Sequence, residues 1–184
     1  EFDFRLITVS TDCVFDGARG NYSESDIPNA TDLYGKSKNL GEVDSERALT
    51  LRTSIIGREI GSAHSLVEWF LSNKGSKVKG FRRAIYSGFP TIVLANIIRS
   101  LIFERADLKG LYHVSSDPIN KYELLLLLKR FYGVDVEIEP DDEFRIDRSL
   151  DSGRFRKETG LEPAAWPEMV EQMASDPTPY ERWK

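Results

Sequence analysis

Short β-rich runs alternate with segments of helical periodicity along this chain, and that alternation limits its fold more than any other feature of the sequence. The β-rich runs lie at residues 4–10, 49–52, 110–115 and 134–139. The principal helical segments, marked by capping residues and breakers, lie at residues 33–48, 91–104 and 120–132. This pattern predicts an α/β fold in which residues 4–10, 49–52 and 110–114 share one mainly parallel sheet. We expect the helix that contains Tyr34 to pack on one face of that sheet.

Glycine and proline divide the rest of the chain into shorter elements. Thr91 and Asn120 are placed to cap the helices that follow them. We also expect short strands at 78–81 and 84–86, a turn at 88–90, and helices at 63–73, at 152–159 and from Pro167.

No glycine-rich GxGxxG turn occurs in the chain, although such a turn normally starts the phosphate-binding helix of a dinucleotide-binding sheet. Two explanations stay open: the protein is not a dinucleotide enzyme, or this chain lacks the half that carries the turn. In the second case about three βα units of roughly 30 residues each would precede Phe4. One flank of the sheet would then be a bare edge, which we expect self-association or the missing segment to cover.

Composition restricts the kind of partner and the compartment. The formal net charge of −5 and a pI near 5.2 argue against a general affinity for nucleic acid. The longest apolar run, residues 124–128, is far too short to cross a bilayer. The single cysteine, Cys13, excludes an internal disulfide, and the two histidines lie too far apart in sequence to suggest a metal site. We expect a cytoplasmic globular protein without a metal, a nucleic-acid partner or a membrane segment.

The residues that carry chemistry lie at the end of the first strand and the start of the next helix. Thr11 offers a hydroxyl at the carboxyl end of a strand, where ligands of open α/β sheets bind. Tyr34 and Lys38 are spaced i, i+4, so they share a helix face, and a lysine ammonium near a phenol stabilises the phenolate. A hydroxyl donor beside an acidic phenol suits reduction of a carbonyl by hydride from a nicotinamide.

A Tyr-x-x-x-Lys spacing is weak by itself. A second pair, Tyr180 and Lys184, has the same spacing near the end of the chain. An exposed aromatic residue beside surface lysines is therefore an equally good interpretation of Tyr34 when the motif is taken alone.

The surrounding sequence resembles the active-site segment of the dTDP-4-dehydrorhamnose reductase family, which belongs to the extended short-chain dehydrogenase/reductase superfamily. The resemblance begins with Thr-Val-Ser-Thr-Asp-Cys-Val-Phe-Asp-Gly at residues 8–17 and continues with Tyr-Gly-Lys-Ser-Lys at 34–38. It extends over most of the chain through Tyr22, Glu24, Pro28, Gly41-Glu42, residues 51–57, 88–91 and 110–114, and weakly through 148–151.

This resemblance implies a catalytic triad of Thr11, Tyr34 and Lys38, with NAD(P)H as the cofactor. Tyr34, Lys38 and Thr53 would contact the cofactor, and Lys38 would hold the nicotinamide ribose. The residues expected around a nucleotide-sugar substrate are Asp12, Cys13, Ser54, Arg83 and Pro90. Adjacent arginines such as Arg82 and Arg83 are more often a solvated surface than a diphosphate clamp.

Two positions depart from the family pattern. Cys13 stands where the rhamnose-pathway enzymes usually have tyrosine, and Ile55 stands where they usually have tryptophan. Both departures remove a large aromatic group from the sugar pocket, so the class of substrate is better supported than the particular sugar. Cys13 could be a redox thiol, but a small space-filling residue is the preferred interpretation.

The resemblance predicts the carboxy-terminal part of a Rossmann-type parallel sheet together with a smaller α/β substrate-binding subdomain. Residues 1–57 would belong to the dinucleotide-binding domain and 58–184 mainly to the substrate-binding subdomain, with 91–116 returning to the Rossmann core. The expected function of the parent protein is NAD(P)H-dependent reduction of a keto nucleotide sugar in deoxysugar or polysaccharide precursor synthesis. A nucleotide-sugar epimerase or a regulatory subunit of the same fold is the alternative. We expect this chain alone to be inactive and unable to bind NAD(P)H measurably.

Overall fold

A three-stranded parallel sheet forms one half of the structure, a computed structural model that describes residues 4–62 and 64–183. Its strands are β1 (Leu6–Thr11), β2 (Ala48–Thr53) and β6 (Gly110–His113), in the order β1-β2-β6. Both pairings are parallel. The predicted sheet is therefore confirmed, and β1 forms one of its edges.

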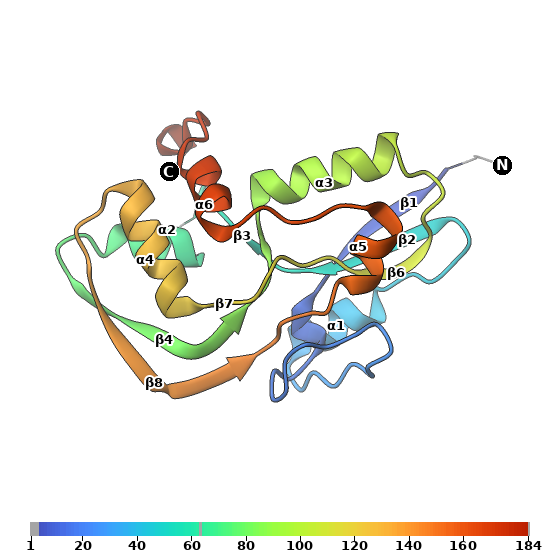
Figure 1. The fold of residues 1–184 in the computed structure, drawn as a ribbon, viewed down its shortest axis with the longest axis horizontal. Coiled ribbons are helices and arrows are strands. Elements are labelled where there is room, and N and C mark those ends of the chain that lie inside the picture. The colour runs from blue at the N-terminus through green and yellow to red at the C-terminus, as the bar shows by residue number, and fades with distance from the viewer. Residues whose placement is uncertain (1–3, 63, 184) are drawn as a thin grey trace.

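Helices lie on either side of these strands (Figure 1). The helix α1 (Leu33–Leu40) lies near the carboxyl end of β1, and α3 (Thr91–Phe103) lies above the sheet in this view. Arg5, the residue before β1, donates hydrogen bonds to the carbonyls of Leu101 (3.0 Å) and Leu108 (2.7 Å). These bonds fix the end of α3 and the turn after it to the first strand.

A second sheet is built entirely from later segments. It contains β7 (Ile119–Asn120), β4 (Lys77–Tyr86) and β8 (Glu137–Asp147) in that order, with β4 antiparallel to β7 and parallel to β8. Two short parallel strands, β3 (Ile55–Ile56) and β5 (Phe89–Pro90), form a separate pair. The division of the chain into two subdomains at residue 57 remains a prediction, although β6 does pair with β2 as expected for segment 91–116.

The remaining elements are short. They are the 3-10 turns η1 (Asp12–Val14) and η2 (Tyr180–Trp183) and the helices α2 (Leu66–Ser72), α4 (Lys121–Tyr132), α5 (Gly153–Thr159) and α6 (Trp166–Ala174). Asn120 caps α4 as predicted, with its side-chain oxygen accepting from the Glu123 amide at 2.8 Å. Thr91 does not cap α3, because Pro90 holds that position and the Thr91 hydroxyl donates to the Ile56 carbonyl at 3.1 Å.

Several predicted bounds were wrong. The turn expected at 88–90 contains the strand β5, and the helix expected at 63–73 covers only Leu66–Ser72. The helix expected to reach residue 48 ends at Leu40, because Gly41 ends it and Glu42 turns inward to pair with Arg52. The two strands expected at 78–81 and 84–86 are one strand, β4, whose pairing register shifts between Phe81 and Arg83. The strand expected at 134–139 begins at Glu137 and runs on to Asp147 beside β4.

One hydrophobic core joins the two sheets. Its fully buried side chains come from β2, α2, α3, α4 and α6 and include Leu49, Leu51, Phe70, Leu101, Leu124, Leu128 and Met169. A small second cluster of Val14, Phe15, Tyr22 and Leu150 holds the loop after β1 against the segment after β8. The position of the residues that follow β1 is therefore set by packing from both ends of the chain.

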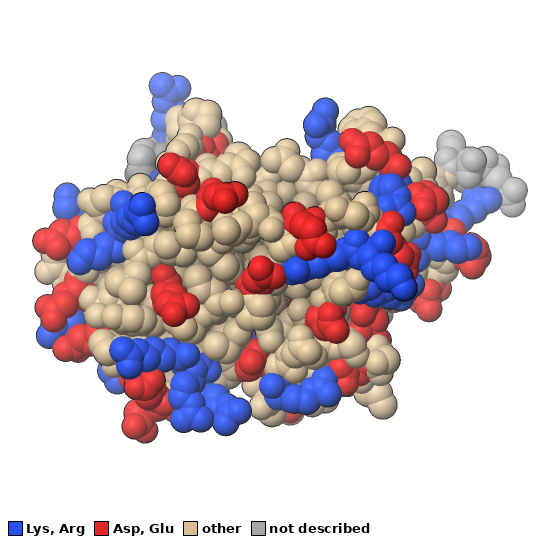
Figure 2. All heavy atoms as spheres, in the orientation of Figure 1, with Lys and Arg blue, Asp and Glu red and all other residues tan. Residues whose placement is uncertain are grey.

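On the face shown in Figure 2, basic and acidic side chains are interspersed. No helix in the described part of the chain is long and apolar enough to cross a membrane. Among the same residues, no group of three or more His, Cys, Asp or Glu side chains is placed to hold a metal ion.

Candidate active site

Thr11 ends β1 and begins the turn η1. Its side chain is buried, and its hydroxyl accepts from the Cys13 amide and donates to the Asp12 carboxylate, both at 3.2 Å. The register pairs Thr11 with Thr53 at the end of β2. Two of the predicted site residues therefore lie side by side at the carboxyl edge of the sheet, where open α/β sheets bind their ligands.

The helix α1, which carries Tyr34 and Lys38, lies against β1 and the turn after it. Asp32 caps this helix by accepting from the Gly35 amide at 2.8 Å, and this hydrogen bond lowers the pKa of the Asp32 carboxyl. The Lys38 ammonium donates to the Val9 carbonyl at 2.7 Å, two residues before Thr11. Tyr34 is 56% exposed, so its phenol is open to an incoming ligand.

Gly35 lets α1 approach the turn after β1. A methyl group at this position would lie 2.2 Å from the Cys13 carbonyl oxygen and 2.5 Å from the Ala30 side chain. The first contact is with backbone, which cannot swing aside as a flexible side chain could. Gly35, the residue after Tyr34, is therefore packed directly against Cys13, two residues after Thr11.

We expect Gly35→Ala to lower both stability and activity. The helix must move to relieve the clash, which should cost about 1–3 kcal/mol of unfolding free energy and displace Tyr34 from Thr11. Gly41→Ala is the matched control, because a methyl group there lies no closer than 3.5 Å to a neighbouring atom. Chemical denaturation and turnover assays of the protein that contains this chain would test this. Equal effects of the two substitutions would contradict the assigned role of Gly35.

A cavity of about 250 Å³ lies beside the turn after β1. It is lined by Asp12, Cys13, Ser54, Ile55, Ile56, Leu66, Ile85, Tyr86, Lys121, Ile146 and Arg148. Three predicted substrate-binding residues (Asp12, Cys13 and Ser54) therefore share this cavity. The other predicted site residues do not line it, so their assignment to the reaction, the cofactor or the substrate remains a prediction; they are Thr11, Tyr34, Lys38, Thr53, Arg83 and Pro90.

Burial dominates the electrostatics of this cavity. It raises the pKa of the Asp12 carboxyl and of the Cys13 thiol, because each charged form would lose its hydration. The Tyr86 hydroxyl is buried without a hydrogen-bond partner, and burial followed by the nearby Asp12 charge raises its pKa well above the ordinary value. The raised pKa values favour the neutral, hydrogen-bond-donating forms of the Cys13 thiol and the Tyr86 hydroxyl.

Sequence reasoning missed Tyr86, Lys121 and Arg148. The resemblance at residues 148–151 was too weak to assign a role to Arg148. Lys121 follows the recognised cap Asn120 and therefore had a predictable place at the start of a helix, but nothing in the sequence placed that helix beside Cys13. All three lie on the second sheet or the segments that adjoin it.

A buried ion pair joins the segment after α1 to β2. The Arg52 guanidinium binds both oxygens of Glu42, at 2.8 and 2.7 Å, and Glu42 also accepts from the Ser10 hydroxyl at 2.6 Å. His113 lies 3.3 Å from Arg52 and contacts the Tyr22 carbonyl at 2.8 Å, and burial lowers its pKa. This network ties α1 and the loop after β1 to the centre of the sheet.

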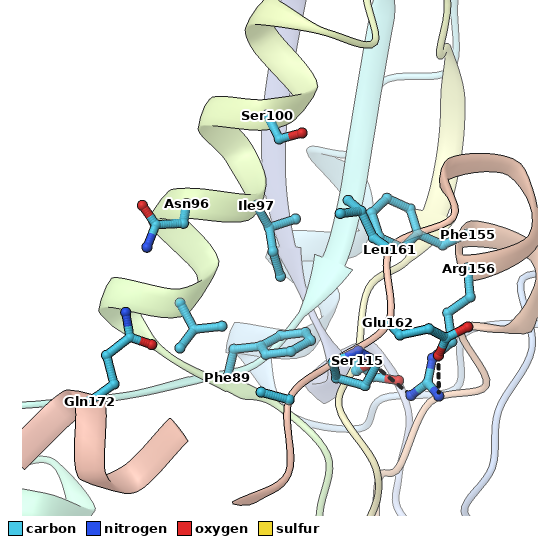
Figure 3. A pocket seen from close by; sticks show the side chains of 13 residues that line it. Phe89, Asn96, Ile97, Ser100, Ser115, Phe155, Arg156, Leu161, Glu162 and Gln172 are labelled. Atoms are coloured by element: carbon cyan, nitrogen blue, oxygen red, sulfur yellow. Dashed lines mark hydrogen bonds and ion pairs between the residues drawn. The ribbon is translucent and has the colours of Figure 1, made fainter. Parts of the chain in front are cut away.

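A second, more apolar cavity of about 320 Å³ lies between α3 and residues 161–164 (Figure 3). Phe89 and Ile97 face it, and Arg156 at its rim contacts Ser115 and Glu162. None of the predicted site residues lines it.

The family model described as the RmlD substrate binding domain matches residues 1–178. Methionine adenosyltransferase 2 subunit beta of Xenopus tropicalis is 32% identical over 135 residues, which cover 65% of this chain and 39% of that protein. The dTDP-4-dehydrorhamnose reductase of Aggregatibacter actinomycetemcomitans is 33% identical over 122 residues, covering 61% of this chain and 42% of the reductase. The chain thus corresponds to about two fifths of these curated relatives.

Two solved structures have the same fold. A hypothetical dTDP-4-dehydrorhamnose reductase from Sulfolobus tokodaii superposes with a TM-score of 0.72 at 32% identity, over 88% of this chain and 62% of that one. The dTDP-4-dehydrorhamnose reductase from Bacillus anthracis, solved in complex with NADP, gives a TM-score of 0.77 at 24% identity, over 92% and 64%.

Proposed function

This chain belongs to the RmlD substrate-binding domain family, and from that premise we propose that the protein containing it reduces a keto nucleotide sugar with NADPH or NADH. One observation carries the proposal. Thr11 ends the first strand, and the helix that carries Tyr34 is held against that strand through Lys38 and Gly35. This arrangement supports a reacting centre made of the Thr11 hydroxyl at the end of the strand and the Tyr34 phenol and Lys38 ammonium on the adjoining helix.

Each group has a distinct part in the proposed reaction. The Thr11 hydroxyl turns from Asp12 to donate to the carbonyl oxygen of the substrate. Tyr34 donates the proton that completes the new hydroxyl, and the positive charge of Lys38 stabilises the phenolate that remains. The buried Asp12 and the small Cys13 line the sugar side of the pocket.

The cofactor would contact only part of this chain. Tyr34 and Lys38 suit the ribose of a nicotinamide nucleotide, whose ring supplies the hydride when the cofactor is bound. The sequence contains no GxGxxG motif. The pyrophosphate of the cofactor would therefore be held by residues outside this sequence. The NADP in the Bacillus anthracis relative supports this cofactor class.

A regulatory subunit is the second candidate. The similarity to methionine adenosyltransferase 2 subunit beta favours it, because that protein is a subunit of another enzyme's assembly. Such a protein could bind the cofactor and still have no turnover. The presence of Thr11, Tyr34 and Lys38 together favours the reductase.

The two candidates differ in a direct assay. We expect the protein that contains this chain to oxidise NADPH or NADH when a 4-keto nucleotide sugar is added, at a rate proportional to enzyme concentration. Absorbance of the reduced cofactor follows the reaction, and titration calorimetry measures cofactor binding separately. Cofactor binding without turnover of any keto nucleotide sugar would contradict the reductase and favour the regulatory subunit.

A further inference from the structure

The cavity beside Cys13 contains an excess of positive charge. Of its lining residues, Lys121 and Arg148 are basic and Asp12 alone is acidic. The other walls are formed by isoleucine and leucine side chains together with a few neutral polar groups. A charge surrounded by such walls interacts strongly with any partner that enters, because little water is present to screen it.

Lys121 lacks a bonded partner in the described part of the chain. It is the first residue of α4, and its ammonium makes no hydrogen bond or ion pair there. Burial lowers the pKa of Lys121, and the charge of Arg148 lowers it further, while Asp12 acts in the opposite direction. The neighbouring charges therefore include one that repels Lys121 and one that attracts it.

Only some of the N–H donors of Arg148 make hydrogen bonds with the described residues. Its Nε donates to the Phe15 carbonyl at 2.9 Å, and its Nη1 lies 3.5 Å from the Cys13 sulfur, a weak acceptor. A guanidinium has five N–H donors, so most of those on Arg148 make no hydrogen bond with the described residues. The planar fork that binds carboxylates in pairs of bonds is therefore available at the cavity.

Two partly buried cations with one acid in the cavity wall favour a further anion there, since the Asp16 and Asp32 carboxyls that also interact with Arg148 lie outside that wall. Asp12 cannot compensate both, and its own burial disfavours its charged form. Ser54 and the unpartnered Tyr86 hydroxyl add neutral groups to the same wall. The cavity is thus built to receive a ligand that carries negative charge and hydrogen-bonding oxygens.

We propose that Lys121 and Arg148 bind a carboxylate on the sugar ring, so that the substrate is a keto sugar of the uronic-acid type. The inference rests on the proposed function, which places the reacting carbonyl at Thr11. The cavity begins at the next two residues, so it receives a substituent close to that carbonyl. In a 4-keto pyranose the carbonyl is C4, and the neighbouring ring carbon C5 bears C6. The diphosphate is attached to C1, on the opposite side of the ring.

The departure at Cys13 agrees with this assignment. A tyrosine there would be larger and would compete for the space in front of Arg148, whose guanidinium now contacts the Cys13 sulfur. The small thiol leaves more room beside the Arg148 guanidinium than a tyrosine would. Binding of the carboxylate would replace a weak sulfur contact with charge-assisted hydrogen bonds.

The test compares glucose and glucuronic acid esters of the same nucleoside diphosphate, which differ only at C6. Affinities of the uridine and deoxythymidine diphosphate forms, and of the free nucleoside diphosphates, are measured by titration calorimetry on the protein that contains this chain. We expect the glucuronic ester to bind about 10- to 100-fold more tightly than the glucose ester. Lys121→Met and Arg148→Met should each remove most of that preference.

Two further variants are controls that distinguish loss of the carboxylate site from misfolding. Arg148→Lys keeps the charge but not the fork, and it should retain part of the preference. Lys79→Met removes an exposed lysine that pairs with Asp141 outside the cavity, and it should leave the preference unchanged. Thermal unfolding midpoints of all variants show whether each one is folded.

Each other outcome overturns the inference in a different way. Equal affinity for the two esters would refute the carboxylate site and leave the proposed function intact. Equal weakening of both esters and of the free nucleoside diphosphate in Lys121→Met would assign the cations to the diphosphate instead. Failure of every nucleotide and nucleotide sugar to bind would refute the inference and the proposed function together.

Discussion

Replacing Tyr34 by phenylalanine is expected to lower kcat by about 10²- to 10⁴-fold while changing KM only a few-fold. The substitution removes only the phenolic hydroxyl, which in the proposed reaction donates its proton in the transition state. Tyr34 is 56% exposed, so the loss of the hydroxyl should have little effect on folding. Steady-state kinetics with a keto nucleotide sugar and NADPH would measure both constants.

Tyr180→Phe is the matched control, because Tyr180 belongs to the other Tyr-x-x-x-Lys pair of the sequence. Its hydroxyl donates to Asp176 at 2.6 Å, at the far end of the chain from the site. We expect near-normal kcat for this variant. Near-normal turnover in Tyr34→Phe, or parallel losses in both variants, would contradict the role of Tyr34 as the acid.

Replacing Arg52 by methionine is expected to lower the free energy of unfolding by about 3–5 kcal/mol. The side chains of Arg52 and Glu42 are only 5% and 10% exposed, so the substitution leaves a buried carboxylate without its cation. The loss should also free Glu42, which anchors the segment after α1 to the sheet. Denaturant unfolding of the protein that contains this chain would measure the effect.

Two further variants distinguish the contribution of the ion pair to the unfolding free energy from a general effect of substitution. Lys77→Met removes two ion pairs, with Glu137 and Glu139, in which all three side chains are at least half exposed, and it should cost no more than about 1 kcal/mol. The double variant Arg52→Met with Glu42→Leu should recover much of the loss, because no unpaired charge remains. A cost for Arg52→Met as small as that for Lys77→Met would refute the proposed importance of the buried pair.

The sheet was predictable because its strands are continuous apolar or β-branched runs bounded by loops. Leu49 and Leu51 are fully buried, as expected for a central parallel strand covered on both faces. The length of α1 was not predictable from periodicity, since Val43 and Ala48 continue the apolar pattern beyond its end. Its true end depends on the ion pair of Glu42 with Arg52, a contact made only in the folded chain.

The site was predictable only in part, because it too depends on contacts that form only in the folded chain. Thr11, Tyr34 and Lys38 lie within one short stretch of sequence, so a motif could reveal them. Lys121 and Arg148 are more than 100 residues from Cys13 in sequence and reach it through the second sheet. A single sequence gives no signal for such long-range contacts between a helix start, a strand end and a loop.

Transfer of label from deuterated NADPH to the sugar would test the central claim most directly. The protein that contains this chain is incubated with a keto nucleotide sugar and cofactor carrying deuterium at the reactive carbon of the nicotinamide. Mass spectrometry then compares the sugar product with that from unlabelled cofactor. The account predicts a reduced sugar that carries the deuterium, and no such product with Tyr34→Phe on the same time scale. An epimerised but unlabelled sugar would indicate an epimerase, and an unchanged sugar in the presence of bound cofactor would contradict the reductase altogether.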